Sequence, residues 1–298
     1  MGFDLNKIPD QTGKVAIVTG SNIGVGFATA KYLVLNNAHV IIASRTEKKG
    51  LDAVAELVKM KPDAKVEFMQ LDLASLDSVR AFVNAFIEKG LPLHILVNNA
   101  GIAGVPHSKT ADGCEISLAT NHLGTYLLTT MLLDTLKKSA PARVVTVSSL
   151  LANGAKADFD DVGGKRYETS DMGVYAVTKL YNIMFAQELD KRVRGEGVRS
   201  FVVQPGIVKS DLFRKTETTA FTTLSKAMKF LMQTPDQGSI SSLYAATSDE
   251  VIPIGASKMF GPNYMNIGNS AARKIGAKDV NDINNKLLWE KTQELVSA

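Results

Sequence analysis

The chain has 298 residues, 45% of them apolar and 21% charged, and its net charge of +4 comes from scattered lysines and arginines. This composition is typical of a globular protein, and without a basic cluster it gives no reason to expect a nucleic-acid partner. The lone cysteine, Cys114, excludes an internal disulfide, and four isolated histidines lack metal-ligand spacing, so no metal is expected. The chain start lacks a signal-peptide pattern and no apolar run reaches the ~20 residues of a membrane span. We therefore expect a cytoplasmic protein without a membrane anchor.

The first predicted strand, Val15–Thr19, is a short β-branched run that leads into a glycine-rich turn and then a helical pattern from Phe27. Glycines at such a turn let the backbone approach a ligand and aim amide N–H groups at an anion. The alternative is a tight strand-to-helix connection without a ligand. The residues expected to contact a phosphate are Gly20, Ser21, Asn22, Ile23, Gly24 and Gly26.

The second predicted strand, His39–Ala43, runs into a basic corner. Where NAD-selective enzymes usually place an acid for the ribose hydroxyls, the chain has Ser44, and Arg45 follows it. Because arginine suits a 2′-phosphate, the corner favours NADP(H) over NAD(H). A solvated basic helix start is the alternative reading.

Further strands and helices alternate along the rest of the chain. We predict an α/β fold: a single-domain Rossmann-type, doubly wound parallel sheet of about seven strands, with helices on both faces. In such sheets ligands bind at the carboxyl ends of the strands, where Gly20, Arg45, Asp72 and Asn98 all fall. The remaining strands are expected at 65–71, 95–97, 143–147, 197–204 and 258–260, and the helices at 46–61, 76–90, 115–138 and 235–246.

Three segments fall outside this alternation. Residues 150–174 are rich in Gly, Asp and Lys and are expected to form a loop with little regular structure. Residues 211–234 are predicted to form a lid of short helices over the site, or else a surface hairpin. The amphipathic tail at 279–296 is predicted to pack against the body or a partner subunit, which leaves a homo-oligomer open. No linker appears, so residues 1–298 are taken as one domain.

Tyr175 and Lys179 lie four residues apart on a predicted helix, so both side chains project from one face. A phenol ionises near pH ~10, and a nearby cation favours the phenolate, which would let the tyrosine exchange a proton near neutral pH. Such a pair is more often a half-solvated surface pair, so it carries weight only together with the other motifs.

Several motifs occur in one order along the chain, and together they resemble the classical short-chain dehydrogenase/reductase family over residues 10–265. The long gap between Ser149 and Tyr175, with Arg45 after the second strand, is most similar to the retinol-dehydrogenase-like and protochlorophyllide-reductase-like branch. The motifs are Thr19-Gly20-x-x-x-Gly24-x-Gly26, Asn98-Asn99-Ala100-Gly101, Asn121, Ser149, Tyr175-x-x-x-Lys179 and Pro205-Gly206.

The resemblance implies a catalytic set and a cofactor set. Tyr175 would be the general acid/base, Lys179 would lower its pKa, and Asn121 would hold a water of a proton relay. Ser149, preferred over Ser148, would hydrogen-bond the substrate oxygen. The implied contacts with the nicotinamide cofactor, beyond the glycine-rich turn and Arg45, are Asp72, Leu73, Asn98, Ala100, Gly101, Tyr175, Lys179, Pro205, Gly206, Ile207 and Ser210.

The sequence departs from the family pattern at two places. Thr178 stands where many members have Ser, and Ser210 replaces the Thr usual after the Pro-Gly turn. Both changes keep a hydroxyl.

The function implied is an NADP(H)-dependent oxidoreductase that interconverts an alcohol and a ketone or aldehyde. Apolar side chains in the predicted lid, such as Phe213, Phe221 and Met228, favour an apolar small-molecule substrate. Reduction of an activated C=C bond is the enzymatic alternative, and a non-catalytic NADP-binding protein is the alternative from another class.

Overall fold

The strands of the protein follow its short β-branched apolar runs. The computed structural model describes residues 3–166, 171–209, 232–262 and 270–297. They form one sheet with the strand order β3-β2-β1-β4-β5-β6-β7-β8, parallel except where β8 pairs antiparallel with β7. The strands are β1 (Val15–Thr19), β2 (His39–Ser44), β3 (Val66–Gln70), β4 (Ile95–Asn98), β5 (Ala142–Val147), β6 (Val198–Val203), β7 (Met259–Gly261) and β8 (Ala271–Arg273).

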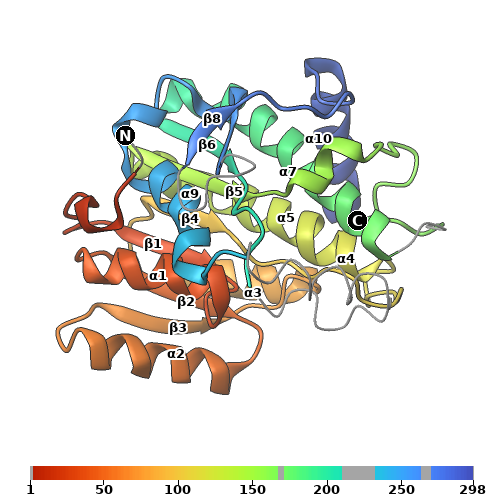
Figure 1. The fold of residues 1–298 in the computed structure, drawn as a ribbon. Coiled ribbons are helices and arrows are strands. Elements are labelled where there is room, and N and C mark those ends of the chain that lie inside the picture. Colours follow the sequence, from red (N-terminus) through yellow and green to blue (C-terminus); the bar gives the residue numbers. More distant parts are fainter. Residues whose placement is uncertain (1–2, 167–170, 210–231, 263–269, 298) are drawn as a thin grey trace.

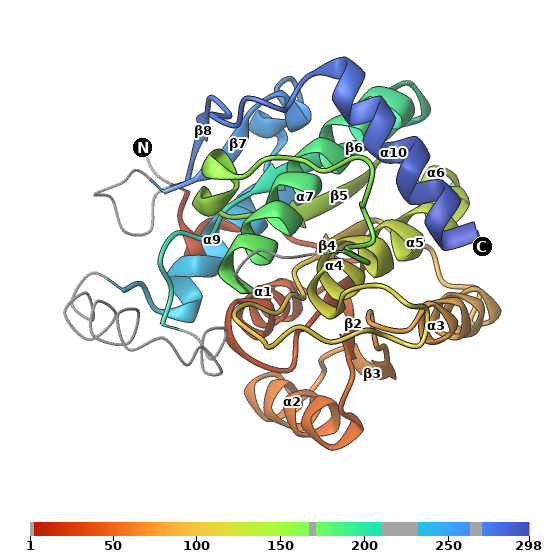
Figure 2. The same ribbon diagram turned by 90° about the vertical axis from the view of Figure 1, so that its right-hand side faces the viewer.

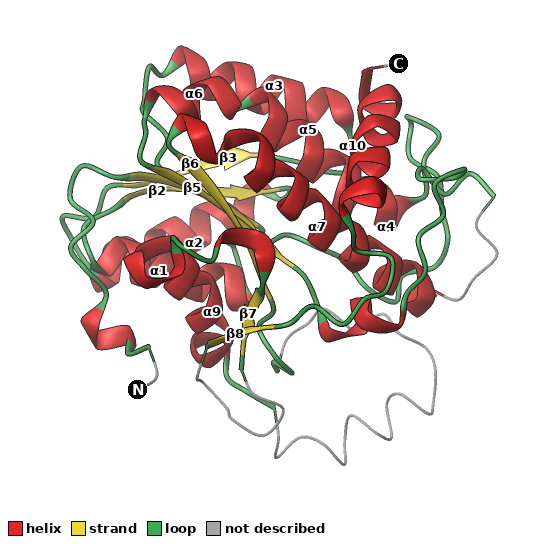
Figure 3. Ribbon diagram, turned by 90° about the horizontal axis from the view of Figure 1, so that it is seen from above, coloured by secondary structure: helices red, strands yellow, loops and turns green. Residues whose placement is uncertain are grey.

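Helices cover both faces of this sheet, as Figures 1 and 2 show from two sides and Figure 3 from above. α1 (Gly24–Leu35), α2 (Glu47–Met60) and α9 (Pro235–Thr247) lie on one face. The other face carries α3 (Leu76–Glu88), α4 (Ile116–Leu118), α5 (Gly124–Met131), α6 (Leu133–Lys138), α7 (Asp171–Val193) and α10 (Asp282–Ser297). The predicted doubly wound α/β sheet is confirmed, and β8 raises the strand number from about seven to eight.

The side chains of each strand alternate between two apolar cores. Ala16 and Val18 of β1 point to the core under α1, α2 and α9, whereas Val15 and Ile17 point to the core under α3, α5 and α7. Because both faces are buried, the strands read as continuous apolar runs rather than alternating ones.

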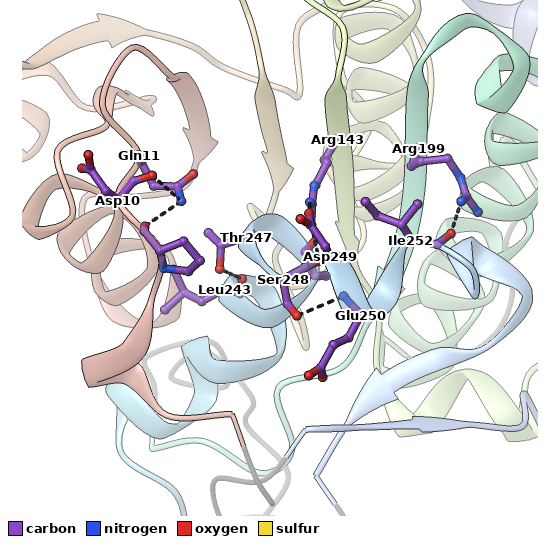
Figure 4. A network of polar contacts seen from close by, with 12 residues as sticks. Asp10, Gln11, Arg143, Arg199, Leu243, Thr247, Ser248, Asp249, Glu250 and Ile252 are labelled. Atoms are coloured by element: carbon purple, nitrogen blue, oxygen red, sulfur yellow. Dashed lines mark hydrogen bonds and ion pairs between the residues drawn. The ribbon is translucent and has the colours of Figure 1, made fainter.

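The amino ends of β5 and β6 are closed by polar contacts to the segment after α9 (Figure 4). Arg143 donates to the Ser248 carbonyl at 2.5 Å and pairs with Asp249 at 2.5 Å. Arg199 donates to the Ile252 carbonyl and pairs with Asp190 at 2.9 Å. The candidate residues Gly20, Arg45 and Asn98 lie at the opposite, carboxyl edge of the sheet.

Two expectations about helices need correction. The predicted helix at 115–138 is interrupted: the π-helical turn η2 (Ala119–Leu123) separates α4 from α5, and α6 follows separately. The predicted loop at 150–174 contains the 3₁₀ helix η3 (Leu150–Gly154), which begins because Ser149 caps it, and α7 already starts at Asp171. An acid in the first turn suits a helix start, because it faces the positive end of the helix dipole.

The two segments proposed to flank the site have different outcomes. The predicted lid at 211–234 lies almost entirely in 210–231, outside the described residues. The tail forms α10, which packs against α7 in the body of the protein through Leu288 and Trp289. No helix in the described part of the chain is long and apolar enough to cross a membrane.

Candidate active site

The turn between β1 and α1 requires glycine at two places where backbone segments nearly touch. A Cβ on Gly20, whose φ is +64°, would lie 2.9 Å from Ala100 Cα. A Cβ on Gly26 would lie 2.4 Å from Asn99 Nδ2 and 2.5 Å from the Gly20 carbonyl oxygen. Atoms this close would have to move, so these glycines bring the turn against the segment that follows β4.

The N-terminus of α1 is built to receive an anion. No side chain caps it, since its N-cap is Ile23, and Gly24 (φ +63°) has open space where a Cβ would stand. Backbone N–H groups at an uncapped helix start bind phosphate well. The Ser21 hydroxyl is buried and donates to the Val18 carbonyl at 2.6 Å, so any contact with a phosphate would come from its main chain.

Sequence reasoning missed the hydrogen bonds that join the ends of β1 and β4. Thr19 Oγ1 accepts from the amides of Asn99 and Ala100, each at 3.0 Å. Asn99 Nδ2 donates back to the Thr19 carbonyl at 2.8 Å. Two polar residues at neighbouring strand ends were the available signal, and their contacts hold the turn and the Ala100-Gly101 segment together.

The other predicted cofactor residues at strand ends differ in how they face this edge. Arg45 is exposed directly after β2, where it is free to meet a phosphate. Asp72 is half-buried and accepts from the Ala74 amide at 3.0 Å. Leu73 is buried. The Asn98 side chain points into the protein, where Nδ2 donates to Thr129 Oγ1 at 2.9 Å, so only its main chain faces the edge.

Asn121 lies in the π-helical turn η2, fully buried, and its side chain joins three segments. Its Oδ1 accepts from the Ile102 amide at 2.8 Å, and its Nδ2 donates to the Ile102 carbonyl at 2.9 Å and to Thr178 Oγ1 at 3.0 Å. Thr178 in turn donates to the Tyr175 carbonyl at 2.7 Å. π turns inside α-helices are frequent at functional sites. The threonine noted only as a departure in the sequence thus links Asn121 to the helix of the predicted catalytic tyrosine.

Tyr175 and Lys179 are both buried on α7, 4% and 3% exposed, rather than half-solvated at the surface. Lys179 Nζ lies 5.7 Å from the centre of the Tyr175 ring and donates to the Val147 carbonyl at 3.0 Å. A Cβ on Gly101 would be 3.3 Å from both Lys179 Nζ and Asn121 Oδ1. The glycine therefore keeps open the space between the amide and the ammonium.

The two neighbouring serines have different tasks. Ser148 is buried and its hydroxyl donates to the Lys179 carbonyl at 2.7 Å, so it is committed to holding α7. Ser149 is partly exposed, accepts from the Leu151 amide at 3.3 Å and contacts the Tyr175 phenol. The hydrogen bond with Ser149 lowers the pKa of the phenol, so the Ser149 hydroxyl acts as a donor toward the Tyr175 oxygen.

Burial dominates the electrostatics of this pair. Burial raises the pKa of Tyr175 to about 12, against a smaller opposing effect of the hydrogen bond with Ser149. Burial also lowers the pKa of Lys179 to about 8. Burial and the hydrogen bond with Ser149 together set the raised pKa of the phenol, so Tyr175 is a protonated acid at neutral pH in the protein alone.

The Pro205–Gly206 peptide unit after β6 is fixed at both of its polar atoms. Its carbonyl accepts from Gln233 Nε2 at 3.0 Å, and its N–H donates to Gln204 Oε1 at 2.7 Å. Both glutamines are buried, and neither was identified from sequence. Ile207, next along the chain, is 47% exposed, and Ser210 lies outside the described residues.

The residues brought together at this edge fit a dinucleotide. The uncapped helix start suits a pyrophosphate, the exposed Arg45 suits a further phosphate, and Gly101 leaves room beside Lys179. A buried acid beside a hydroxyl donor suits proton transfer to an oxygen. Among the described residues no group of His, Cys, Asp and Glu side chains is arranged to hold a metal ion.

Comparison with known proteins agrees with this arrangement. The sequence profile of the family described as "short chain dehydrogenase" matches residues 14–220. The chain is 40% identical over 259 residues to polyprenol dehydrogenase of Danio rerio, covering 85% of this chain and 80% of that protein. It is 40% identical over 237 residues to human retinol dehydrogenase 11, covering 80% of this chain and 74% of that protein.

Solved structures agree as well. An uncharacterised protein from Mycobacterium paratuberculosis superposes with a TM-score of 0.80 at 30% identity, covering 100% of this chain and 98% of that one. An NADPH-bound short-chain oxidoreductase from Pseudomonas aeruginosa has the same fold, with a TM-score of 0.64 at 22% identity, covering 84% of this chain and 95% of that one. The protein belongs to the short-chain dehydrogenase family, in its retinol-dehydrogenase-like branch.

Proposed function

We propose that the protein is an NADP(H)-dependent oxidoreductase that interconverts an apolar alcohol and its aldehyde or ketone. The observation that carries the proposal is the protonated, buried Tyr175 with the Ser149 hydroxyl against it and Lys179 behind it. The retinol and polyprenol in the relatives' names are both isoprenoid alcohols, which supports the alcohol–carbonyl reaction and an apolar substrate. Leu151 and Ile207, 46% and 47% exposed, follow Ser149 and the Pro-Gly turn closely and offer apolar surface there.

The chain's own residues would act as follows. A bound nicotinamide supplies or accepts the hydride. In reduction the Tyr175 hydroxyl donates its proton to the carbonyl oxygen while the Ser149 hydroxyl donates a hydrogen bond to the same oxygen, where negative charge develops. The Lys179 ammonium stabilises the phenolate that remains. In oxidation the same groups act in reverse, with the phenolate as the base.

Two basic features would hold the cofactor. The uncapped start of α1 would bind the pyrophosphate, and Arg45 would bind the 2′-phosphate that distinguishes NADP from NAD. The buried side chain at Ser44, where an acid would favour NAD, supports the same preference. Asn121 would hold the Ile102 segment and α7 in place beside the nicotinamide.

The test is a panel of apolar aldehydes and ketones that includes retinal and a polyprenal, followed through the nicotinamide absorbance with product analysis. Alcohol products are expected, whereas a saturated aldehyde would indicate reduction of the C=C bond instead. Tyr175→Phe is expected to abolish turnover while NADPH fluorescence titrations give a Kd close to that of the wild type. Turnover near the wild-type rate in Tyr175→Phe would refute its role as the acid/base.

A further inference from the structure

Two side chains of α7 share one backbone acceptor at the carboxyl end of β5. The Val147 carbonyl accepts from Lys179 Nζ at 3.0 Å and from Asn182 Nδ2 at 3.2 Å. Val147 is the last residue of β5, so its carbonyl lies where the ladder of the sheet stops. Lys179 and Asn182 are 3% and 2% exposed and lie three residues apart, on one face of the helix. The position of the Lys179 ammonium is therefore tied to that of the Asn182 amide.

Asn182 has a buried polar neighbour on its far side. It lies against His122, which follows Asn121 in the π turn η2 and is 1% exposed. His122 Nε2 is 2.9 Å from Thr292 Oγ1 of α10, and Thr292 is fully buried. A line of buried polar groups thus runs from α10 through His122 and Asn182 to the carbonyl that anchors Lys179.

We propose that Asn182 is a positioning residue for Lys179, which fixes the shared Val147 carbonyl and weakens the hold of the ammonium on it. Two donors on one oxygen compete, so the Asn182 amide weakens the hydrogen bond that the carbonyl offers the ammonium. This favours the neutral amine, because a hydrogen bond to the charged form of a group is what stabilises that form. This inference rests on the proposed function, in which Lys179 acts beside Tyr175.

The other groups around Lys179 set the background for the contact with the shared Val147 carbonyl. Tyr175 faces the ammonium from the same helix, and Asn121 faces it across Gly101. In the part of the chain that the structure describes, burial lowers the pKa of Lys179, and no carboxylate counters this effect. Beyond Asn182, burial lowers the pKa of His122 to about 3, so the imidazole stays neutral while Lys179 titrates.

The test is an NMR titration of Lys179 Nζ in the cofactor-free protein, with the signal assigned by its loss in Lys179→Met. Asn182→Leu removes the donor at similar volume, and we expect the pKa of Lys179 to rise but to stay below its ordinary value, because the lysine remains buried. Asn182→Asp replaces the donor with an acceptor of nearly the same shape, and we expect a larger rise. The pH at which NADPH affinity changes, measured by fluorescence titration, should move in the same direction.

Ser148→Ala is the matched control, because it removes another buried hydrogen bond between β5 and α7 but leaves the Val147 carbonyl untouched. We expect Ser148→Ala to leave the pKa of Lys179 unchanged. An unchanged titration in Asn182→Asp, or an equal shift in Ser148→Ala, would overturn the inference; if Asn182→Leu fails to fold, the aspartate variant decides. Failure of the proposed function would appear separately, as retained turnover in Tyr175→Phe.

Discussion

Replacing Lys179 by methionine is expected to make the protein more stable while it abolishes activity. Lowering the pKa of the lysine from 10.5 to about 8 corresponds to about 3 kcal/mol against the buried ammonium at neutral pH. Methionine fills a similar volume but leaves the Val147 carbonyl with one donor fewer, and this loss offsets about 1 kcal/mol of the gain from removing the ammonium. We therefore expect Lys179→Met to raise the free energy of unfolding at pH 7 by about 2 kcal/mol.

This gain should disappear in alkaline solution. The folded pKa of Lys179 is depressed, so the buried ammonium destabilises the wild type fully below about pH 8. This destabilisation is relieved as the pH rises from about 8 to 10.5. In that range the unfolded chain binds a proton that the folded chain does not, and stability rises with pH. By pH 9.5 the free energy of unfolding of the wild type should have risen by about 2 kcal/mol, so the wild type and Lys179→Met become nearly equal in stability.

Urea unfolding at pH 7 and pH 9.5 measures both free energies, with the fluorescence of the single tryptophan, Trp289, as the probe. Trp289 is buried between α10 and α7, stacked on Phe185 at 5.8 Å, so unfolding exposes it. Lys191→Met, on the same helix but with a side chain 54% exposed, is the control and should change little at either pH. A Lys179→Met protein that is less stable than the wild type at pH 7, or a difference that does not depend on pH, would refute the reasoning.

Three further predictions concern the cofactor turn, the basic corner and the buried histidine. Gly26→Ala should both destabilise the fold, by about 1–3 kcal/mol in urea unfolding, and weaken NADPH binding, because its Cβ would lie 2.4 Å from Asn99 Nδ2. Arg45→Asp should weaken NADPH, measured by fluorescence titration, by about 1–3 kcal/mol but leave NADH affinity no lower; equal losses for both cofactors would contradict the assignment. The pKa of His122, about 3, lies below its unfolded value, so its contribution to stability is lost as the pH falls. From pH 7 to pH 5 the free energy of unfolding of the wild type should therefore fall by about 2 kcal/mol more than that of His122→Gln. Equal losses in both proteins, measured by urea unfolding, would show that His122 is not the cause.

Much of the fold was predictable because the strands carry strong local signals. β1, β2 and β5 are buried on both faces and have mostly apolar sequences, and the structure places them within a residue of the predicted ranges. β8 is three residues long, only partly buried, and pairs at the sheet edge, so its sequence, Ala271–Arg273, carries no strand pattern. Its existence depends on a pairing with β7 that periodicity does not record.

The convergence of the candidate residues at one edge was predictable, and the contacts that support them were less so. Strand ends converge in a parallel sheet, so the turn after β1 and the segment after β4 were expected to meet. The family resemblance favoured Ser149 over Ser148, but the physical reason lies in a tertiary contact, the hydrogen bond from the Ser148 hydroxyl to the Lys179 carbonyl. The π turn at Asn121 and the role of Gln233 were not predicted for a similar reason, because both depend on partners far along the chain.

The contact of α10 with α7 has a consequence for how the protein is made. α10 follows every other described element along the chain, yet Leu288 and Trp289 complete the core over α7, and Thr292 bonds His122 beside the predicted catalytic Asn121. During synthesis, α7 therefore emerges with an apolar face that stays uncovered until about ninety further residues, on the order of seconds of translation, have followed. A ribosome that stalls or stops before α10 releases a chain with exposed core, which chaperones and proteases can recognise. The assembly of the site thus depends on synthesis of the chain through α10.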